Sequence, residues 1–562
     1  MRPPARILRV LPVVLLAALA VPSVPILAAG AAAPRKAPPA VAPAWHDALT
    51  RALGAGRIDE AQYALERVAS VFDPASVRAR FGDVRRPDPR DATILLRDLM
   101  LRVQDLSGAD RARARIYLAR PTKPSDDDAY SVNEETPVCS TDVCIHYVGT
   151  TGDAPPNEDT SPANGIPDAV DATGAVMDDV WTFVVDTLGY RAPKSDTNSQ
   201  DDGGNGKLDV YLANIGGKGL YGYCTSDDPN QKPSSGYNFY DLSAYCVLDD
   251  DYAEFGYPDP MDPLTVTAVH EFFHAVQFAY DAYEDPWIME ASSTWIEDEL
   301  YDAVDDNLQY LAQSPLAQPL VPVDKNTSPR WYGAWIFIRF LSEYVGANDG
   351  GATDPDPSIV RSIWTKLDGS PGGPDLYSTQ AVASAIAART LNGSKGKIRW
   401  VFADFGLWNS VPKKFYSEGA SYGPADIAES KALTGSNHTF ASTDPIDHLS
   451  NRFVSLKRGS GIAGDAKLKI RIDGPDTVSS PEASAVVVKK TGAVSAKAIV
   501  LDSAGRGSLK VAFDSTVARV IVIATNGSVR YTNCWTGATL YACYGGNPVD
   551  ENRSFTVRAA VV

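Results

Sequence analysis

Two histidines four residues apart, with a glutamate directly after the first, are the residues of this sequence best suited to chemistry. On an α-helix such a pair lies one turn apart, so both imidazoles project from one face and can hold a Zn²⁺ ion. The intervening glutamate is placed to take a proton from the water that the ion activates. The alternative is an amphipathic helix with two buried histidines, which the scarcity of histidine, six in 562 residues, disfavours. The stretch reads Val269-His270-Glu271-Phe272-Phe273-His274-Ala275-Val276-Gln277.

A catalytic zinc ion needs a third protein ligand and an open position for water. Downstream, Pro286 and the apolar residues at helical spacing up to Tyr301 predict a second helix. Glu290 lies in its first turn and is the candidate third ligand. The alternative is that its carboxylate only stabilises the helix dipole.

The two motifs together resemble the gluzincin zinc metallopeptidases, because His270-Glu271-x-x-His274 is followed by Trp-x-x-Glu-Ala-x-x-x-Trp around Glu290. The stretch His-Glu-Phe-Phe-His-Ala-Val-Gln, with Asn-Gly-Ile-Pro-Asp and Leu-Asp-Val-Tyr-Leu upstream, also resembles a group of largely uncharacterised secreted bacterial metalloproteases over residues 45–455. The resemblance implies a zincin-like domain in which Glu271 is the general base. It also implies a sheet edge that binds a protein or peptide substrate by main-chain hydrogen bonds.

This sequence departs from the gluzincin pattern at three points. Fifteen residues separate His274 from Glu290, a shorter connection than in thermolysin or the aminopeptidases, so the loop between the helices must be tight. Thermolysin-like enzymes place an aspartate four residues after the glutamate ligand to orient a histidine, and Thr294 stands there instead. Aminopeptidase-type gluzincins carry Tyr-x-x-Gly near the start of a later helix, whereas Tyr332 directly precedes Gly333. Tyr332 is therefore a candidate for stabilising the oxyanion, with core packing as the alternative.

The elements around these motifs predict an α+β fold with a mixed sheet and active-site helices, and the resemblance implies that residues 122–434 form a zincin-like metallopeptidase domain. Strands are expected at 143–148, 208–212 and 245–249, and helices at 331–341, 357–367, 379–391 and 397–408. From residue 435 short alternating runs, separated by Gly, Asp, Ser and Asn, predict a β-sandwich over 435–562. His146, in the first strand, is expected to be a packed core histidine.

The beginning of the chain has the features of a secretory signal peptide over residues 1–30. A basic head, an apolar run over 10–27 and a small-residue stretch follow one another. The alternative is an uncleaved anchor helix, which Pro22 and Pro25 disfavour. A secreted protein with no membrane span after removal of the signal peptide is expected, and the six cysteines are consistent with an oxidising compartment. Short local disulfides are the simplest arrangement, although six cysteines allow 15 pairings.

Residues 31–121 are expected to form a helical prosegment or accessory domain, with helices at 45–53, 59–71, 93–106 and 109–118. Residues 30–121 contain 16 Lys and Arg against 11 Asp and Glu, whereas residues 122–300 contain 6 against 35. The mildly basic segment could therefore dock electrostatically on the acidic body. It contains no cysteine, so any inhibition of a zinc site would have to be steric.

Two acidic loops, at 159–171 and 196–209, are rich in oxygen ligands of the kind that Ca²⁺ prefers. Neither has the closing glutamate of an EF-hand. The second loop is the candidate calcium site, with a solvated acidic turn as the alternative, and its candidate ligands are Asp201, Asn205 and Asp209.

These features favour a secreted zinc endopeptidase in which His270, His274 and Glu290 hold Zn²⁺. The alternatives are an exported calcium-stabilised binding or adhesion protein with a structural metal site, and an aminopeptidase. The net charge of −18 disfavours nucleic acid as a partner.

Overall fold

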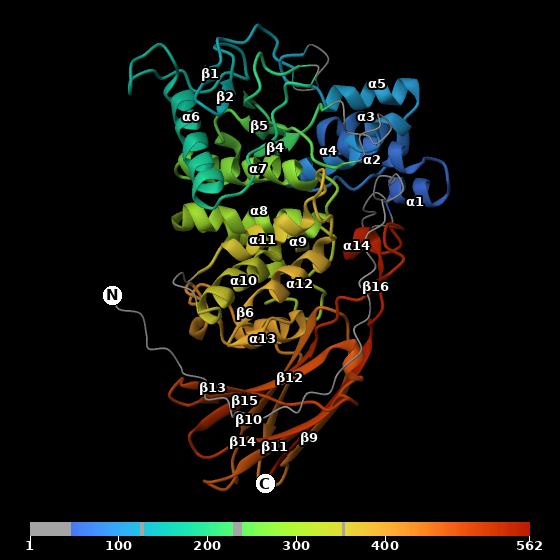
Figure 1. Cartoon of the computed structure of the whole chain (residues 1–562), viewed down its shortest axis with the longest axis vertical. Helices are drawn as coiled ribbons and strands as arrows, with labels where there is room; N and C mark the ends of the chain where they lie inside the picture. The colour runs from blue at the N-terminus through green and yellow to red at the C-terminus, as the bar shows by residue number, and fades with distance from the viewer. Residues whose placement is uncertain (1–46, 124–128, 200, 229–238, 351–354) are drawn as a thin grey trace. The chain divides into compact units, whose positions relative to one another are not determined.

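The structure, a computed structural model, describes residues 47–123, 129–199, 201–228, 239–350 and 355–562 (Figure 1). Helices and strands occur together in an α+β arrangement, and the C-terminal region is β-rich. The signal peptide predicted at 1–30 lies outside the described residues. Within these ranges we find no helix with the length and apolar character that crossing a membrane requires.

The N-terminal helical segment consists of five helices, and four of them were predicted from the sequence. Their starts are encoded locally: the side chain of Asp47 caps α1, and Asp59 and Gln62 form a capping box at α2. The predicted helix at 93–106 ends earlier, at Met100, where a short 3₁₀ turn follows. The helix that the sequence reading missed is α3. The five are α1 (Ala48–Gly54), α2 (Glu60–Phe72), α3 (Pro74–Phe81), α4 (Ala92–Met100) and α5 (Gly108–Tyr117).

A five-stranded mixed sheet follows, with the strand order β1-β2-β3-β5-β4. The three inner strands are parallel and buried along their whole length, as expected for strands covered on both faces. The outer strands β1 and β4 are antiparallel to their neighbours, and β4 was not predicted because its four residues carry no alternating pattern. The strands are β1 (Val138–Cys139), β2 (Val143–His146), β3 (Leu208–Ala213), β4 (Gly222–Thr225) and β5 (Tyr245–Asp249).

Helices α7 (Met261–Asp281) and α8 (Pro286–Tyr301) carry the candidate metal ligands. Helix α7 packs on β4 and β5 on one side and on α8 on the other (Figure 1). Only residues 282–285 separate the two helices, so the expected tight loop is confirmed. The remaining helices include the four that the sequence predicted, although the run at 331–341 divides into α9 and α10. They are α6 (Asp168–Trp181), α9 (Arg330–Gly333), α10 (Trp335–Asn348), α11 (Ser358–Leu367), α12 (Ser378–Ala388) and α13 (Ile398–Ser410).

The C-terminal β-rich region contains two larger sheets, with the orders β13-β12-β15-β10-β8 and β14-β11-β18-β9, and a two-stranded sheet of β16 (Tyr531–Thr532) and β17 (Asn547–Pro548). Side chains from both larger sheets, among them Val454 and Leu468, share one apolar core. Strand β8 lies before the domain boundary predicted after residue 434, yet it pairs with β10. The strands are β8 (Glu429–Leu433), β9 (Thr439–Ile446), β10 (Ser450–Arg458), β11 (Lys467–Asp473), β12 (Pro481–Lys489), β13 (Val494–Ala498), β14 (Arg506–Ala512), β15 (Val517–Asn526) and β18 (Arg553–Val561).

All six cysteines form disulfides between near neighbours in the sequence, as the simplest arrangement predicted. One of these bonds links β4 to β5 across directly opposed residues. The pairs are Cys139–Cys144, Cys224–Cys246 and Cys534–Cys543.

Candidate metal centre

Three ligand-type atoms from α7 and α8 converge on one point. The Nε2 atoms of His270 and His274 are 3.1 Å apart. The Oε2 atom of Glu290 lies 3.2 Å from Nε2 of His270 and 3.7 Å from Nε2 of His274. A tetrahedral zinc ion with bonds of about 2.0–2.1 Å has ligand atoms about 3.3–3.4 Å apart. The triangle therefore has the size that zinc requires, and the structure brings the three predicted ligands together.

The carboxylate of Glu290 is fully buried, which makes its environment informative. Among the described residues it has no hydrogen-bond partner besides the two imidazoles. Burial alone would raise the pKa of Glu290, but His274 and His270 lower it to about 2, so the group is an anion. A buried anion is costly unless a cation or donors surround it. The donor set of two imidazoles and one carboxylate thus fits a divalent ion of the zinc type.

The Nδ1 atom of each histidine, which is not part of the ligand triangle, is hydrogen-bonded to a second side chain. Nδ1 of His270 lies 2.5 Å from Oε1 of Glu297, and Nδ1 of His274 lies 2.8 Å from Oε1 of Gln277. Each acceptor holds the proton on Nδ1 and leaves the lone pair of Nε2 directed at the common point. Burial would lower the pKa of His270, but Glu290 and Glu297 raise it well above its ordinary value. Without a metal His270 therefore keeps a proton, which metal binding must displace.

Glu297 and Gln277 were not singled out from the sequence. Thr294, which stands where thermolysin-like enzymes carry the orienting aspartate, is buried and contacts neither histidine through a hydrogen bond recorded in the structure. Glu297 lies seven residues after Glu290, hence on the same face of α8, and this spacing was the available signal. The amide nitrogen of Gln277 donates to the Met289 carbonyl oxygen at 3.0 Å, so the amide oxygen is the end that faces His274.

Glu271, the predicted general base, lies beside the ligands without being one of them. It is not a member of the group of ligand atoms that lie within 4.8 Å of one another. Its Oε2 accepts a hydrogen bond from Oγ1 of Thr93, a residue of α4, at 2.8 Å. Its side chain is 5 % exposed, so little solvent reaches it. No sequence pattern indicates this contact.

A cavity reaches the candidate metal centre, and Tyr332 forms part of its wall. The ring of Tyr332 stacks on Tyr310 at 4.9 Å and lies 6.2 Å from the His270 ring. Its hydroxyl donates to the Arg90 carbonyl oxygen at 2.9 Å, so the packing role predicted as the alternative is confirmed. Whether it also stabilises an oxyanion stays a prediction. The wall consists of Arg90, Tyr221, Gly222, Tyr257, Val266, Thr267, His270, Glu271, Glu297, Asp306, Gln309, Tyr310 and Tyr332.

Comparison with known proteins assigns no family to this chain. No protein-family model matches it, and no curated protein matches it. Among solved structures, the surface-associated copper-binding protein CorA of Methylomicrobium album BG8 aligns at 12 % identity and a TM-score of 0.16, over 24 % of this chain and 98 % of CorA. A family GH115 4-O-methyl-α-glucuronidase aligns at 8 % identity and a TM-score of 0.13, over 54 % of this chain and 38 % of the enzyme. At these scores neither likeness carries an argument.

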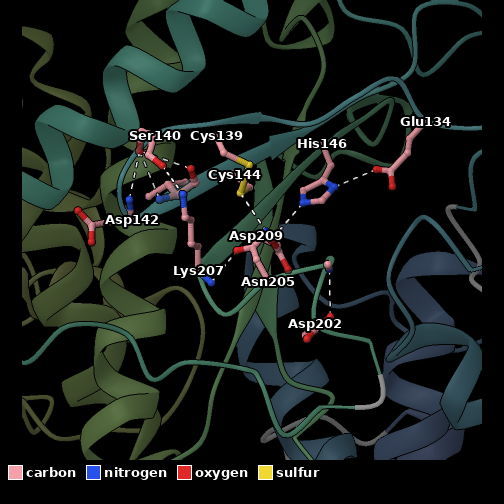
Figure 2. Close-up of a disulfide and its surroundings, with 12 residues drawn as sticks. Glu134, Cys139, Ser140, Asp142, Cys144, His146, Asp202, Asn205, Lys207 and Asp209 are labelled. Carbon is pink, nitrogen blue, oxygen red and sulfur yellow. Dashed lines mark hydrogen bonds and ion pairs between the residues drawn. A yellow bond between two sulfur atoms is a disulfide. The ribbon is translucent and has the colours of Figure 1, made fainter.

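The candidate calcium ligands are each engaged in other contacts. Asp201 forms an ion pair with Lys123 at 2.8 Å. The side-chain amide of Asn205 donates to Sγ of Cys144, and its oxygen accepts from the Lys207 amide at 2.9 Å (Figure 2). Asp209 also has partners within the chain, so each of the three candidate ligands is already engaged, and calcium stays a prediction.

Asp209 instead belongs to a buried ion-pair cluster around Arg120. The guanidinium of Arg120 contacts Asp209, Asp196 at 2.6 Å and Asp227 at 3.0 Å. The other oxygen of Asp209 lies 3.0 Å from Nε2 of His146, which is buried as predicted and stacks on Tyr211 (Figure 2). We call Arg120 with Asp196, Asp209 and Asp227 the Arg120 cluster. The guanidinium of Arg120 therefore supplies the positive charge that was expected from a calcium ion.

The first acidic loop, 159–171, uses its carboxylates to stabilise its own backbone. Asp159 accepts from the amides of Asn164 and Gly165, and Asp168 accepts from those of Thr160 and Ser161. Such bonds are typical of side-chain-stabilised turns.

Proposed function

We propose that this protein is a secreted, zinc-dependent endopeptidase of the gluzincin type, with a zincin-like catalytic domain. The observation that carries the proposal is the convergence of His270 Nε2, His274 Nε2 and Glu290 Oε2 at separations of 3.1–3.7 Å, where the buried carboxylate has no partner besides the two imidazoles among the described residues. Three protein ligands and an adjoining cavity are the pattern of a catalytic site, because a structural zinc site is closed by four.

The zinc ion and the side chains each have their own part in the proposed reaction. Zinc, when bound, supplies a Lewis acid that polarises a carbonyl group and makes water more acidic. Glu271 accepts the proton of the attacking water and then donates it to the leaving amine, first as general base and then as general acid. Glu297 and Gln277 hold the two imidazoles in the orientation that this geometry needs. The hydroxyl of Tyr332 is the candidate donor to the oxyanion.

The edge strand β4 is the element suited to bind a polypeptide. It lies at the end of the mixed sheet and packs on α7, the helix of the two histidines, and its Gly222 lines the cavity. An extended peptide can add to such an edge through main-chain hydrogen bonds, which accept most side chains. This favours a protein or peptide substrate and internal cleavage.

The test combines metal analysis with hydrolysis of an unfolded protein. In Glu271→Gln we expect stoichiometric zinc and a loss of hydrolysis of about 10²–10⁴-fold, because only the proton acceptor is removed. In His274→Ala we expect the loss of both. Thr294→Val, a change on α8 at a hydroxyl that has no hydrogen-bond partner among the described residues, is the matched control and should retain both. Undiminished hydrolysis by a zinc-loaded Glu271→Gln chain would show that Glu271 is not the base.

A further inference from the structure

Residues 88–93, which belong to the N-terminal helical segment, contact the proposed base, the edge strand β4 and the tyrosine wall of the cavity. We call them the 88–93 stretch; they include the first residues of α4. Asp91 and Thr93 are buried, at 1 % and 2 % exposure. Three sets of contacts define what the stretch does there.

The first contact is with the proposed base. Oγ1 of Thr93 donates to Oε2 of Glu271 at 2.8 Å. In the proposed reaction Glu271 accepts a proton from an attacking water, so a hydroxyl that already donates to this carboxylate takes the place of that water.

The second contact is with the edge strand. The same Oγ1 accepts a hydrogen bond from the backbone amide of Cys224, in β4, at 2.9 Å. In an antiparallel pair alternate residues direct their backbone groups away from the partner strand. The amide of Cys224 is therefore on the outer side of β4, where an added strand would bind. Thr93 satisfies this amide in place of a substrate.

The third contact is with the tyrosine wall of the cavity. The Arg90 carbonyl oxygen accepts the hydroxyl of Tyr332, and Asp91 Oδ1 lies 3.2 Å from it. The guanidinium of Arg90 lies over the Tyr310 ring at 5.5 Å and donates to Gln309 at 3.0 Å. The candidate oxyanion donor is thus also engaged by the stretch.

We propose that the N-terminal helical segment is autoinhibitory: the 88–93 stretch occupies the substrate site, and its Thr93 holds Glu271 and the amide of Cys224 in a closed state. The inference rests on the proposed function and adds its regulation. Substrate can bind only after the stretch leaves β4. No cysteine and no metal ligand from the segment is needed, because the block acts on the base, the edge strand and the tyrosine.

The rest of the segment fastens the stretch in place. Arg120, at the end of the segment, is buried in the Arg120 cluster, and Arg97 of α4 donates to the Glu284 carbonyl oxygen next to α8. Arg86 donates to the Lys218 carbonyl oxygen just before β4. Arg120 thus meets carboxylates of the acidic body, whereas Arg97 and Arg86 bind backbone carbonyl oxygens.

The first test weakens the closed state in the full-length, zinc-loaded chain. Thr93→Val keeps the shape of the side chain and removes both hydrogen bonds, and each bond contributes about 1 kcal/mol, which is about fivefold in a population. Two rates are measured: hydrolysis of an unfolded protein, and removal of zinc by a chelator. We expect Thr93→Val to raise both by about tenfold or more, and Thr93→Val with Arg90→Ala to raise them further. Thr50→Val, in α1 of the same segment, is the matched control and should change neither.

A second variant closes the site instead of opening it. A Cβ atom built on Gly219 would lie 3.6 Å from Cβ of Pro89, within the span of a disulfide. Pro89→Cys with Gly219→Cys should therefore link the 88–93 stretch to the loop before β4. We expect the oxidised form to lose hydrolysis and to release zinc more slowly, and mild reduction to restore both. The wild-type chain under the same reductant is the control.

The rates of hydrolysis and of zinc removal together distinguish a failure of the autoinhibition proposal from a failure of the proposed protease function. Faster zinc removal in Thr93→Val without hydrolysis in any variant would support the closed state and overturn the protease. Hydrolysis that is equal in the wild-type and Thr93→Val chains, and unchanged in the linked chain, would support the protease and overturn autoinhibition. Hydrolysis that falls in Thr93→Val would make Thr93 a positioning residue for Glu271, which also overturns autoinhibition.

Discussion

The candidate metal centre and the Arg120 cluster are both buried groups of carboxylates and nitrogen atoms, and each contains a predicted metal ligand: all three zinc ligands lie in the first, and Asp209, a candidate calcium ligand, lies in the second. In the Arg120 cluster every carboxylate faces the guanidinium, so the positive charge is part of the chain. In the metal centre the nitrogen and oxygen lone pairs of His270, His274 and Glu290 face one another at 3.1–3.7 Å. The difference lies in whether the protein itself supplies the cation.

This difference matters more than the number of acidic residues. The loop at 196–209 is rich in aspartate, yet its buried carboxylates already have an arginine. The metal centre has one carboxylate, and without an ion a proton on His270 has to balance its charge. Convergence of unpaired lone pairs is therefore a better sign of a metal site than local negative charge.

The largest effect is expected where the internal cation is removed. Arg120→Met leaves three carboxylates without their partner, two of them fully buried, which should lower the free energy of unfolding by about 3–5 kcal/mol. The loss should be smaller at acidic pH, because burial raises the pKa of Asp196 to about 7 even beside Arg120, so that its proton neutralises it there. Urea unfolding at pH 5 and pH 8 measures both. Arg115→Met, at an exposed position of α5, is the control.

Two results would contradict this contrast between the metal centre and the Arg120 cluster. If calcium restored the stability of Arg120→Met, the three aspartates could serve a metal ion as well as a guanidinium. If Arg120→Met were as stable as Arg115→Met, the cluster would not depend on its internal cation.

The second prediction addresses the ion itself. Zinc at a thousandfold excess over its dissociation constant should raise the free energy of unfolding by about 4 kcal/mol, because only the folded chain presents the converging ligands. Calcium at the same concentration should leave it unchanged, because its candidate ligands are already paired. Urea unfolding with a chelator, with zinc and with calcium gives the three values. Stabilisation by calcium that disappears in Asp209→Asn would restore the calcium prediction.

A third group, around His448, tests whether a histidine with carboxylates is enough to make a metal site. Nε2 of His448 lies 2.9 Å from Asp324, its Nδ1 contacts Glu551, and the rings of Tyr531 and Tyr541 flank it. Both nitrogens are therefore used, as in an ion pair. Burial would lower the pKa of His448, but Asp324 and Glu551 raise it to about 9.

The pH dependence follows from the direction of this shift. A raised pKa means that the pair stabilises the folded chain fully below the ordinary pKa of histidine, about 6.5, and that this is lost as the pH rises through about 9. The contribution is at most roughly 3 kcal/mol. The stability difference between wild type and His448→Gln should thus be large at pH 6 and small at pH 9.5 in urea unfolding. A difference that grows with pH would contradict the ion pair, and zinc bound in place of the proton would contradict the comparison.

The parts of the site that could be predicted are those set by local spacing. His270 and His274 share a helix face because they are four residues apart, and Glu290 follows from the start of the next helix. The short loop 282–285 was a direct consequence of the chain length between them. The helices of the N-terminal segment could be predicted equally well, because the residues that cap them lie within a few positions of each helix start.

The parts that could not be predicted depend on distant partners. Thr93 meets Glu271 across 178 residues, and Arg120 meets Asp209 across 89. An aspartate that a guanidinium neutralises and one that binds calcium look the same in the sequence. Strand β4 has only four residues, including a glycine and a cysteine, so its place at the sheet edge is decided by pairing with β5.

The smallest effect is expected from the side chain that orients His270. Glu297→Ala removes the acceptor of the Nδ1 proton, so the imidazole loses its fixed orientation, and zinc affinity should fall by about 10–100-fold, or about 1.4–2.7 kcal/mol. Glu297→Gln retains an acceptor oxygen and should recover part of this loss. Competition with a chromogenic chelator measures the affinity, and Thr294→Val on the same helix is the control. If Thr294→Val weakened zinc binding as much as Glu297→Ala, the orienting role would lie where thermolysin-like enzymes have it. If neither variant did, the convergence of the three ligand atoms would itself be sufficient, and the contrast with the Arg120 cluster would rest on those atoms alone.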